Sequence, residues 1–224
     1  MTMPFPGGID ANANATLIFS LVAAVIYAFT LNMPLSLARS AAKTLSVAML
    51  AVLAFMQGGP LLLGAALAVS AVGDAFLSRD GDKAFLGGLA SFLAAHILYV
   101  PLFLRSGGGL DLLGTESWRG AIALAMAAFA IVMLAALWRR VGPGLRLPIV
   151  VYIAAILAMG ISALTTSNTL VIGGAILFMA SDGLLAVEKF LLAAISPHRV
   201  WTRYAVWVLY YVAQLTITLG FLLS

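Results

Sequence analysis

The sequence predicts an all-α membrane protein, in which residues 1–224 form a single integral membrane domain with eight spanning helices. Of its residues 63% are hydrophobic and only 9% are charged, whereas soluble domains average about 25% charged residues. The formal net charge of +4 comes from short loops, which excludes a nucleic-acid-binding protein. The chain has no cysteine, which excludes disulfides, thiolate metal sites and a cysteine nucleophile.

Long apolar runs define the spans, because a membrane-crossing helix needs about 20 mostly apolar residues. Turn residues such as Gly58-Gly59-Pro60 and Gly142-Pro143-Gly144 separate the runs. No basic residue precedes Arg39, so the first run is expected to remain as a helix and not to be cleaved as a signal peptide. The predicted spans are residues 16–33, 41–57, 60–78, 84–104, 118–138, 147–166, 169–188 and 204–223.

Basic residues predict the orientation of these spans. The loops on one side of the membrane hold only two basic residues, Arg105 and Arg119, whereas the loops on the opposite side hold ten. Loops with an excess of Lys and Arg stay in the cytoplasm, so both termini are expected outside it. Richness in Ala, Leu and Gly, together with the compact loops, favours a bacterial inner membrane protein. The loops after the first, third, fifth and seventh spans hold Arg39, Lys43, Arg79, Lys83, Arg139, Arg140, Arg146, Lys189, Arg199 and Arg203.

Two matching segments indicate an internal repeat. The third span ends in AVGDAFLS (71–78), and the seventh contains MASDGLLA (179–186). Four spans separate the segments, so both helices cross the membrane in the same direction. Repeats of this kind are parallel, related by an axis along the membrane normal. The sequence therefore predicts a 4+4 parallel repeat of residues 16–104 and 118–223.

Asp74 and Asp182 are the carboxylates of these segments, and both are predicted to be catalytic. An ionisable residue inside a span costs about 2.5–3.5 kcal/mol at the helix centre and usually faces the bundle interior. Asp74 is expected roughly 7 Å and Asp182 roughly 9 Å from the inner end of the helix. Two carboxylates in one dry layer repel, so one should hold a proton while the other stays ionised, as general acid–base chemistry requires. The alternative is that each pairs with Lys or Arg only to hold helices together.

Other polar residues could join this layer. Lys43 opens the second span and is either a snorkelling anchor or a phosphate ligand. Tyr152 lies near the inner end of the sixth span, and Tyr210 lies at the depth of the aspartates. His96 and Gln214 are expected deeper in the bundle.

Other candidate roles are weaker. Tyr99 shares a helix face with His96 because it follows three residues later. Ser181 lacks the Gly-x-Ser-x-Gly context of a nucleophile, and it is expected to allow close helix packing. Two aspartates and one histidine are a possible metal ligand set, but neither a metal nor a cofactor is predicted. Aromatic-belt anchors are predicted at Trp118, Trp201, Tyr204 and Trp207.

Four motifs in order resemble the YhhN family of membrane proteins: GDAFLS, FLGGLASFLAAHILYV (85–100), GGAILFMASDGLLAVEKF (173–190) and VLYYVAQLTITLG (208–220). They cover the third, fourth, seventh and eighth spans. Lys43 and Tyr152 are compatible with the same family, which includes lysoplasmalogenases.

The resemblance implies an eight-span hydrolase for lysoplasmalogens, which are lysophospholipids with a vinyl ether at the first glycerol carbon. Its products would be a fatty aldehyde and a glycerophospho-alcohol. Asp74 and Asp182 would carry the acid–base steps, with Asp182 preferred as the acid because Asp74 is nearer Arg79 and Lys83 in the sequence. The alternative function is a proton-coupled transporter or lipid-binding protein that uses the aspartates as proton relays. The predicted substrate-binding residues are Lys43, His96, Tyr99, Tyr152, Ser181, Tyr210 and Gln214.

Overall fold

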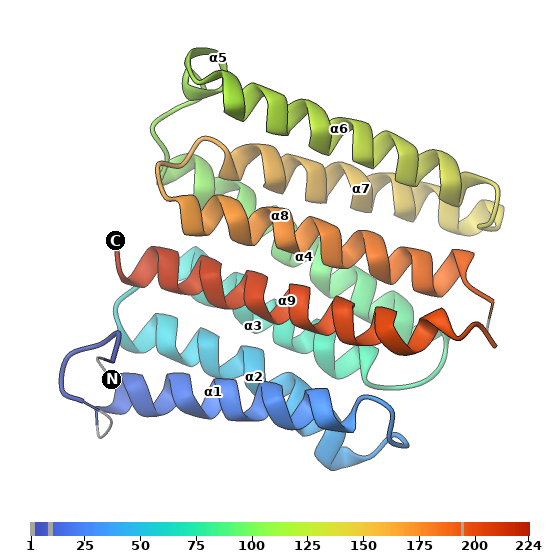
Figure 1. Ribbon diagram of the computed structural model, residues 1–224, viewed down its shortest axis with the longest axis horizontal. Coiled ribbons are helices and arrows are strands. Elements are labelled where there is room, and N and C mark those ends of the chain that lie inside the picture. The colour runs from blue at the N-terminus through green and yellow to red at the C-terminus, as the bar shows by residue number, and fades with distance from the viewer. Residues whose placement is uncertain (1–2, 9–10, 194) are drawn as a thin grey trace.

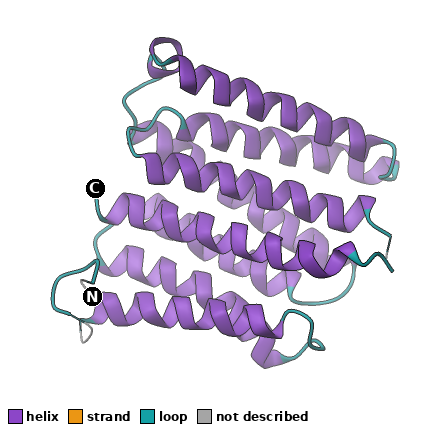
Figure 2. Cartoon of the chain, in the orientation of Figure 1, coloured by secondary structure: helices purple, strands orange, loops and turns teal. Residues whose placement is uncertain are grey.

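The computed structural model describes residues 3–8, 11–193 and 195–224, and within these ranges the chain contains helices and loops but no strand (Figure 2). This confirms the predicted all-α class. The helices are α1 (Asn12–Thr30), α2 (Leu37–Met56), α3 (Leu61–Leu77), α4 (Asp82–Arg105), α5 (Leu112–Thr115), α6 (Ser117–Trp138), α7 (Pro143–Ala163), α8 (Thr169–Ala186), the π-helix η1 (Val187–Leu191) and α9 (His198–Leu222).

Seven of the helices in the described ranges are long and apolar enough to cross a membrane, with α8 and η1 counted as one segment. The predicted span 60–78 corresponds to α3, which is apolar but has only 17 residues. A helix of this length is about 25 Å long, at the lower limit for crossing the hydrocarbon core. The count of eight spans therefore stays a prediction.

The long helices run side by side along the long axis of the molecule, with α6 at one edge and α1 at the opposite edge (Figure 1). α3 and α4 lie behind α8 and α9 in this view. The start of α1 and the end of α9 lie at the same end of the bundle. The opposite end, formed by the loops after α1, α3, α6 and η1, is called the basic end below, because most Lys and Arg residues gather there.

Local sequence signals begin and end the helices. The Ser36 side chain accepts a hydrogen bond from the Arg39 N–H at the start of α2, and Asn168 caps α8 in the same way. Such caps satisfy backbone donors that have no partner inside the helix. Gly58 and Gly81 turn the chain after α2 and α3 with φ values of +66° and +103°, a conformation that L side chains rarely adopt.

Neighbouring helices pack as antiparallel pairs, and the two halves of the chain contact each other mainly through α4 with α7 and α2 with α9, with a smaller contact of α1 with α9. At the α8–α9 contact, a Cβ added to Gly174 would lie 3.0 Å from the backbone oxygen of Ala213. A small residue is therefore needed where these helices approach each other. If the halves are equivalent, α2 and α4 correspond to α7 and α9, and the two cross-contacts correspond as well. The internal repeat itself stays a prediction.

The last helix begins earlier than predicted. The sequence places the eighth span at residues 204–223, but α9 starts at His198. The extra turns carry Arg199 and Arg203, whose guanidinium groups lie 3.9 and 3.3 Å from the Glu188 carboxylate. Charged residues were taken to end the apolar span, whereas ion pairing with η1 allows the helix to continue through them.

Candidate active site

Asp74 is held by side chains from two other helices. Its carboxylate is 1% exposed and lies near the C-terminus of α3. The Oδ2 atom accepts a 2.7 Å hydrogen bond from the Tyr210 hydroxyl of α9. The Nζ atom of Lys43, on α2, lies 3.2 Å from Oδ1. This arrangement pairs the carboxylate with a cation and a hydrogen-bond donor, which together stabilise its ionised form.

Asp182 has a different environment, because no Lys or Arg among the described residues forms an ion pair with it. Its Oδ2 atom accepts a 2.5 Å hydrogen bond from the Tyr152 hydroxyl of α7. The Nε2 atom of His96, on α4, lies 3.6 Å from the same oxygen. The Asp182 side chain is 11% exposed. Both carboxylates thus accept a hydrogen bond from a phenol, and they differ in the second partner, which is an ammonium group for Asp74 and an imidazole for Asp182.

Each aspartate has one partner from a helix of its own half of the chain and one from a helix of the other half. Asp74 on α3 is contacted by α2 and α9, and Asp182 on α8 is contacted by α7 and α4. Under a 4+4 repeat, α2 corresponds to α7 and α9 to α4. Asp74 thus has Lys43 from its own half of the chain and Tyr210 from the other half, whereas Asp182 has Tyr152 from its own half and His96 from the other. This pattern is what a 4+4 repeat would give, and the repeat itself stays a prediction.

Aromatic rings connect a partner of one carboxylate with a partner of the other. The Phe178 ring lies edge-on to the rings of both His96 and Tyr210, at centroid distances of 4.9 and 5.5 Å. Phe92 packs against Phe178 and Tyr210 at 6.3 and 5.5 Å. These contacts fix the orientation of His96 and Tyr210, one partner of each aspartate.

A polar cavity of about 530 Å³ extends from the aspartates to the basic end of the bundle. Asp74, Asp182 and Tyr210 all line it. So do several charged residues nearer the basic end, where Glu188 is paired with arginines of α9. A surplus of cations of this kind suits an anion such as a phosphate. The basic side chains of the lining are Arg39, Lys43, Arg79, Lys189, Arg199 and Arg203.

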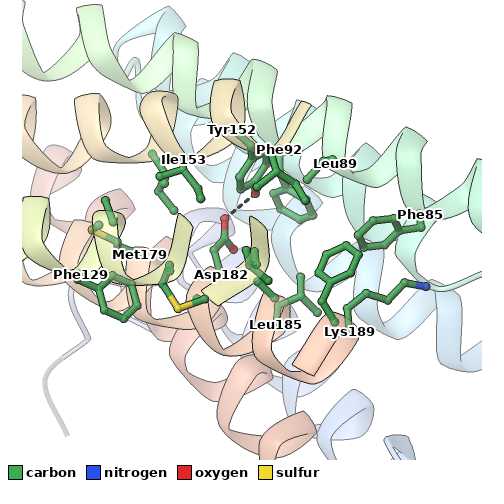
Figure 3. A pocket seen from close by; sticks show the side chains of 18 of the residues that line it. Phe85, Leu89, Phe92, Phe129, Tyr152, Ile153, Met179, Asp182, Leu185 and Lys189 are labelled. Carbon is green, nitrogen blue, oxygen red and sulfur yellow. Dashed lines mark hydrogen bonds between the residues drawn. The ribbon is translucent and has the colours of Figure 1, made fainter. Parts of the chain in front are cut away.

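A second cavity, of about 80 Å³, is almost entirely apolar (Figure 3). Figure 3 shows Asp182 and its hydrogen bond to Tyr152 in the wall of this cavity, among rings and aliphatic side chains. Leu77, Phe85, Phe92, Asp182, Leu185 and Lys189 line both cavities. Asp182 therefore lies where a polar compartment meets an apolar one, whereas Asp74 lines only the polar compartment.

The structure brings most of the predicted site residues together, but not in one contact shell. Tyr99 and Gln214 lie away from the carboxylates, and the Tyr99 hydroxyl donates a 2.6 Å hydrogen bond to the Gln214 Oε1 atom. Both are fully buried and line neither cavity. The Ser181 hydroxyl donates to the backbone oxygen of Val206 in α9, at 3.0 Å, while the residue lines the polar cavity. Contact of these residues with a substrate stays a prediction.

Two sequence-based interpretations are wrong. The expected cationic neighbours of Asp74 were Arg79 and Lys83, yet its ion-pair partner is Lys43, from a different helix. Trp207 was expected in an aromatic belt, but it is only 4% exposed and donates a hydrogen bond to the backbone oxygen of Ala24. For both residues the position along the chain predicts how deep the side chain lies in the membrane. Which residues it contacts depends on which helices pack together, and the sequence does not give that directly.

Several lining residues were not predicted as site residues, among them Phe85, Phe92 and Tyr27. No polar or charge signal marks them, because aromatic residues are common throughout an apolar chain. Among the described residues, no group of three or more His, Asp or Glu side chains is arranged to hold a metal ion. The carboxyl, phenol and imidazole groups of the site can donate and accept protons, and the carboxylates can stabilise a positive charge.

Comparison with known proteins identifies the family of the chain. The YhhN family profile matches residues 38–221, which include both aspartates and all four of their partners. The chain belongs to the YhhN family. Together with the seven apolar helices, membership of this family makes the chain an integral membrane protein.

A curated relative of this YhhN protein is the lysoplasmalogenase TMEM86B of Homo sapiens. The two are 34% identical over 177 residues, which cover 73% of the present chain and 64% of the human protein. The YhhN chain thus matches slightly less than two thirds of its relative's length. No solved structure matches the chain.

Proposed function

We propose that this protein hydrolyses the vinyl ether bond of lysoplasmalogens, releasing a fatty aldehyde and a glycerophospho-alcohol. The observation that carries the proposal is the position of Asp182, a carboxyl group at the junction of a cation-rich cavity and an apolar cavity. A lysoplasmalogen has the same order of parts, because its vinyl ether joins an apolar chain to a phosphate-bearing glycerol. The human relative named a lysoplasmalogenase supports the same substrate class.

The reaction needs an acid, a stabilising anion and one water molecule. The acid transfers a proton to the outer carbon of the double bond, and the π electrons form the new C–H bond. Positive charge then spreads over the inner carbon and the ether oxygen. Water adds to the inner carbon and gives up a proton to the carboxylate that acted as the acid. The resulting hemiacetal moves its hydroxyl proton to the ether oxygen, the carbon–oxygen bond breaks, and the aldehyde and the alcohol separate.

We assign the acid role to Asp182 and the stabilising role to Asp74. Asp182 lines the apolar cavity and has no cationic partner, so it can enter the reaction carrying a proton. Asp74 is held ionised by Lys43 and Tyr210, and a fixed carboxylate favours the positive charge that develops in the transition state. This division between two carboxylates parallels that of glycosidases, which also pass through an oxocarbenium-like transition state.

The cavities suggest how the lipid binds. The phosphate would be placed among the basic side chains of the polar cavity, and the alkyl chain would follow the apolar cavity past Phe129 and Met179. The phosphate and the vinyl ether are separated by only a few bonds, which suits the short distance between the basic end and the aspartates. A single chain in a preformed site would also be held in one orientation, which lowers the entropic part of the barrier.

The proposal includes the membrane arrangement predicted by the sequence. α3 would be the eighth span, both termini would lie outside the cytoplasm, and the polar cavity would open toward the cytoplasmic leaflet of a bacterial inner membrane. This orientation follows from the gathering of basic residues at one end of the bundle.

The decisive test is aldehyde release by purified protein in detergent. The protein is incubated with a lysoplasmalogen or with the matching lysophospholipid that carries an acyl ester, and aldehyde is measured by mass spectrometry. The proposal predicts stoichiometric aldehyde and glycerophospho-alcohol from the vinyl ether and no cleavage of the ester. A transporter would release no aldehyde in detergent, and such a result would refute the proposed activity.

A further inference from the structure

His96 is a fully buried side chain whose role is not explained by packing alone. It lies in the middle of α4 and is 0% exposed. Neither of its ring nitrogens has a hydrogen-bond partner among the described residues. A carboxyl oxygen, Asp182 Oδ2, lies 3.6 Å from Nε2. A buried imidazole must carry at least one N–H group, and such groups are rarely left without an acceptor.

The surroundings select which nitrogen carries that proton. An N–H at Nδ1 would be buried without an acceptor among the described residues, whereas Nε2 lies 3.6 Å from a carboxyl oxygen. Tyr152 and Phe178 hold the ring edge-on at centroid distances of 5.2 and 4.9 Å. These contacts hold the ring in place, and its surroundings favour the tautomer with the proton on Nε2. Shortening the contact by about half an ångström would give an ordinary hydrogen bond.

One hydrogen-bond donor and one potential donor then approach the same oxygen of Asp182. The Tyr152 hydroxyl already donates to Oδ2 at 2.5 Å, and His96 Nε2 approaches the same atom. Oδ1 has no hydrogen-bond partner among the described residues, and the carboxyl group lines both cavities. An oxygen that already accepts a hydrogen bond from Tyr152, with a second potential donor 3.6 Å away, is a poor place for the acidic proton.

We propose that His96 is a positioning residue, not a substrate ligand: with Tyr152 it holds Asp182 Oδ2 as an acceptor and so places the acidic proton on Oδ1, facing the cavities. This inference rests on the proposed function for its catalytic meaning. The underlying geometry concerns only the carboxyl group and its two donors. The partners of Asp74 do not favour one oxygen over the other in this way, since Lys43 approaches Oδ1 and Tyr210 donates to Oδ2.

Two substitutions of His96 separate positioning from packing. His96→Leu fills the space but removes the donor, while His96→Gln restores an N–H near the position of Nε2. Phe103→Leu is the matched control, because Phe103 is fully buried on the same helix and lines neither cavity. We expect His96→Leu to lower kcat by about 10- to 100-fold, the usual effect of losing a group that orients a reactive one. KM should stay unchanged, His96→Gln should recover most of kcat, and Phe103→Leu should affect only thermal stability.

Infrared difference spectroscopy reads the same contact without any substrate. The carbonyl stretch of the Asp182 carboxyl group, identified by its loss in Asp182→Asn, should shift in His96→Leu and return in His96→Gln. If wild-type protein releases no aldehyde, the proposed function fails, but a shifted band still supports the contact. An unshifted band in His96→Leu, or equal losses of kcat in the Leu and Gln variants, would overturn the positioning role.

Discussion

Lys43 and Asp74 form a buried ion pair, with side chains that are 12% and 1% exposed. Removing one partner of such a pair leaves a buried charge without compensation, which typically costs about 3–5 kcal/mol. We therefore expect Lys43→Met to lower the free energy of unfolding in detergent by about this amount and to abolish aldehyde release. The double variant Lys43→Met with Asp74→Asn should regain stability but not activity, because the anionic partner remains absent.

Lys83→Met is the control for this pair, since Lys83 is exposed at the start of α4 and forms no ion pair within the described ranges. Unfolding is followed by thermal melting, and activity by aldehyde release. If Lys43→Met melts and turns over like Lys83→Met, the ion pair does not support the site.

At the residue level, the sequence predicted the two aspartates because a carboxylate inside an apolar run carries a high insertion cost. Tyr152 and Tyr210 could be placed near them by depth along their helices. Lys43 was placed at the correct end of its span, but its pairing with Asp74 depends on the packing of α2 against α3. The same limit explains Trp207, whose depth suits an interfacial anchor but whose side chain faces α1.

α8 places a glycine where the apolar cavity needs space. A Cβ added to Gly183 would press on the Phe129 ring, and both residues line that cavity. We expect Gly183→Ala to displace the ring and to raise KM for a long-chain lysoplasmalogen by about tenfold, the scale of one methylene-sized misfit in an apolar pocket. A short-chain substrate should be affected less. Gly173→Ala on the same helix is the control, because its Cβ would meet no atom within 4 Å. Equal effects of Gly183→Ala on both chain lengths would exclude this path for the chain.

The C-terminus of α7 is held by a cation from α6. Arg119 is 5% exposed, and its Nη1 atom donates 2.6 Å hydrogen bonds to the backbone oxygens of Leu164 and Thr166. A cation at this position complements the helix dipole and satisfies carbonyls that have no partner in the helix. Arg119 also donates a hydrogen bond to Glu116, which lowers the pKa of that carboxyl group.

We expect Arg119→Met to lower the free energy of unfolding by about 2–3 kcal/mol, since it removes charge-assisted hydrogen bonds and leaves buried acceptors unsatisfied. Thermal melting in detergent measures the loss. Arg105→Met removes an exposed arginine from the last turn of α4 and should have little effect. Similar melting temperatures for the two variants would contradict the capping role.

Helix existence followed from the sequence better than helix ends did. Apolar runs predict spans because only internally hydrogen-bonded helices cross lipid as single segments. The start of α9 was missed because its first turns are charged and are stabilised by Glu188 of η1, a contact between segments separated by a loop. Glu188 lies in the π-helix η1, which no local residue pattern in the sequence predicts.

For the whole molecule, the orientation and the eighth span can be tested in one experiment, because the chain has no native cysteine. Single cysteines replace Gln57 and Ser167, exposed at the end opposite the basic end, or Asp80 and Arg140, exposed at the basic end. In intact cells a membrane-impermeant maleimide should label the first pair only. After the cells are opened, it should label all four.

Gln57 and Asp80 flank α3, so opposite labelling of these two positions would establish that this 17-residue helix crosses the membrane. The controls are the same variants treated in permeabilised cells, which show that each cysteine is reactive. Labelling of both Gln57→Cys and Asp80→Cys in intact cells would contradict the eight-span arrangement. Labelling of the basic end alone would reverse the proposed orientation.

The central claim is that the carboxyl groups of Asp74 and Asp182, which have different partners, together hydrolyse a vinyl ether at the junction of two cavities. Its most direct test is the rate of aldehyde release from a lysoplasmalogen by wild-type protein, Asp74→Asn and Asp182→Asn, at matched folded concentrations. Wild-type protein should release aldehyde, and each variant should lose at least about 100-fold in kcat, the typical contribution of a positioned acid or base. Near-normal turnover in either variant would contradict the role assigned to that aspartate.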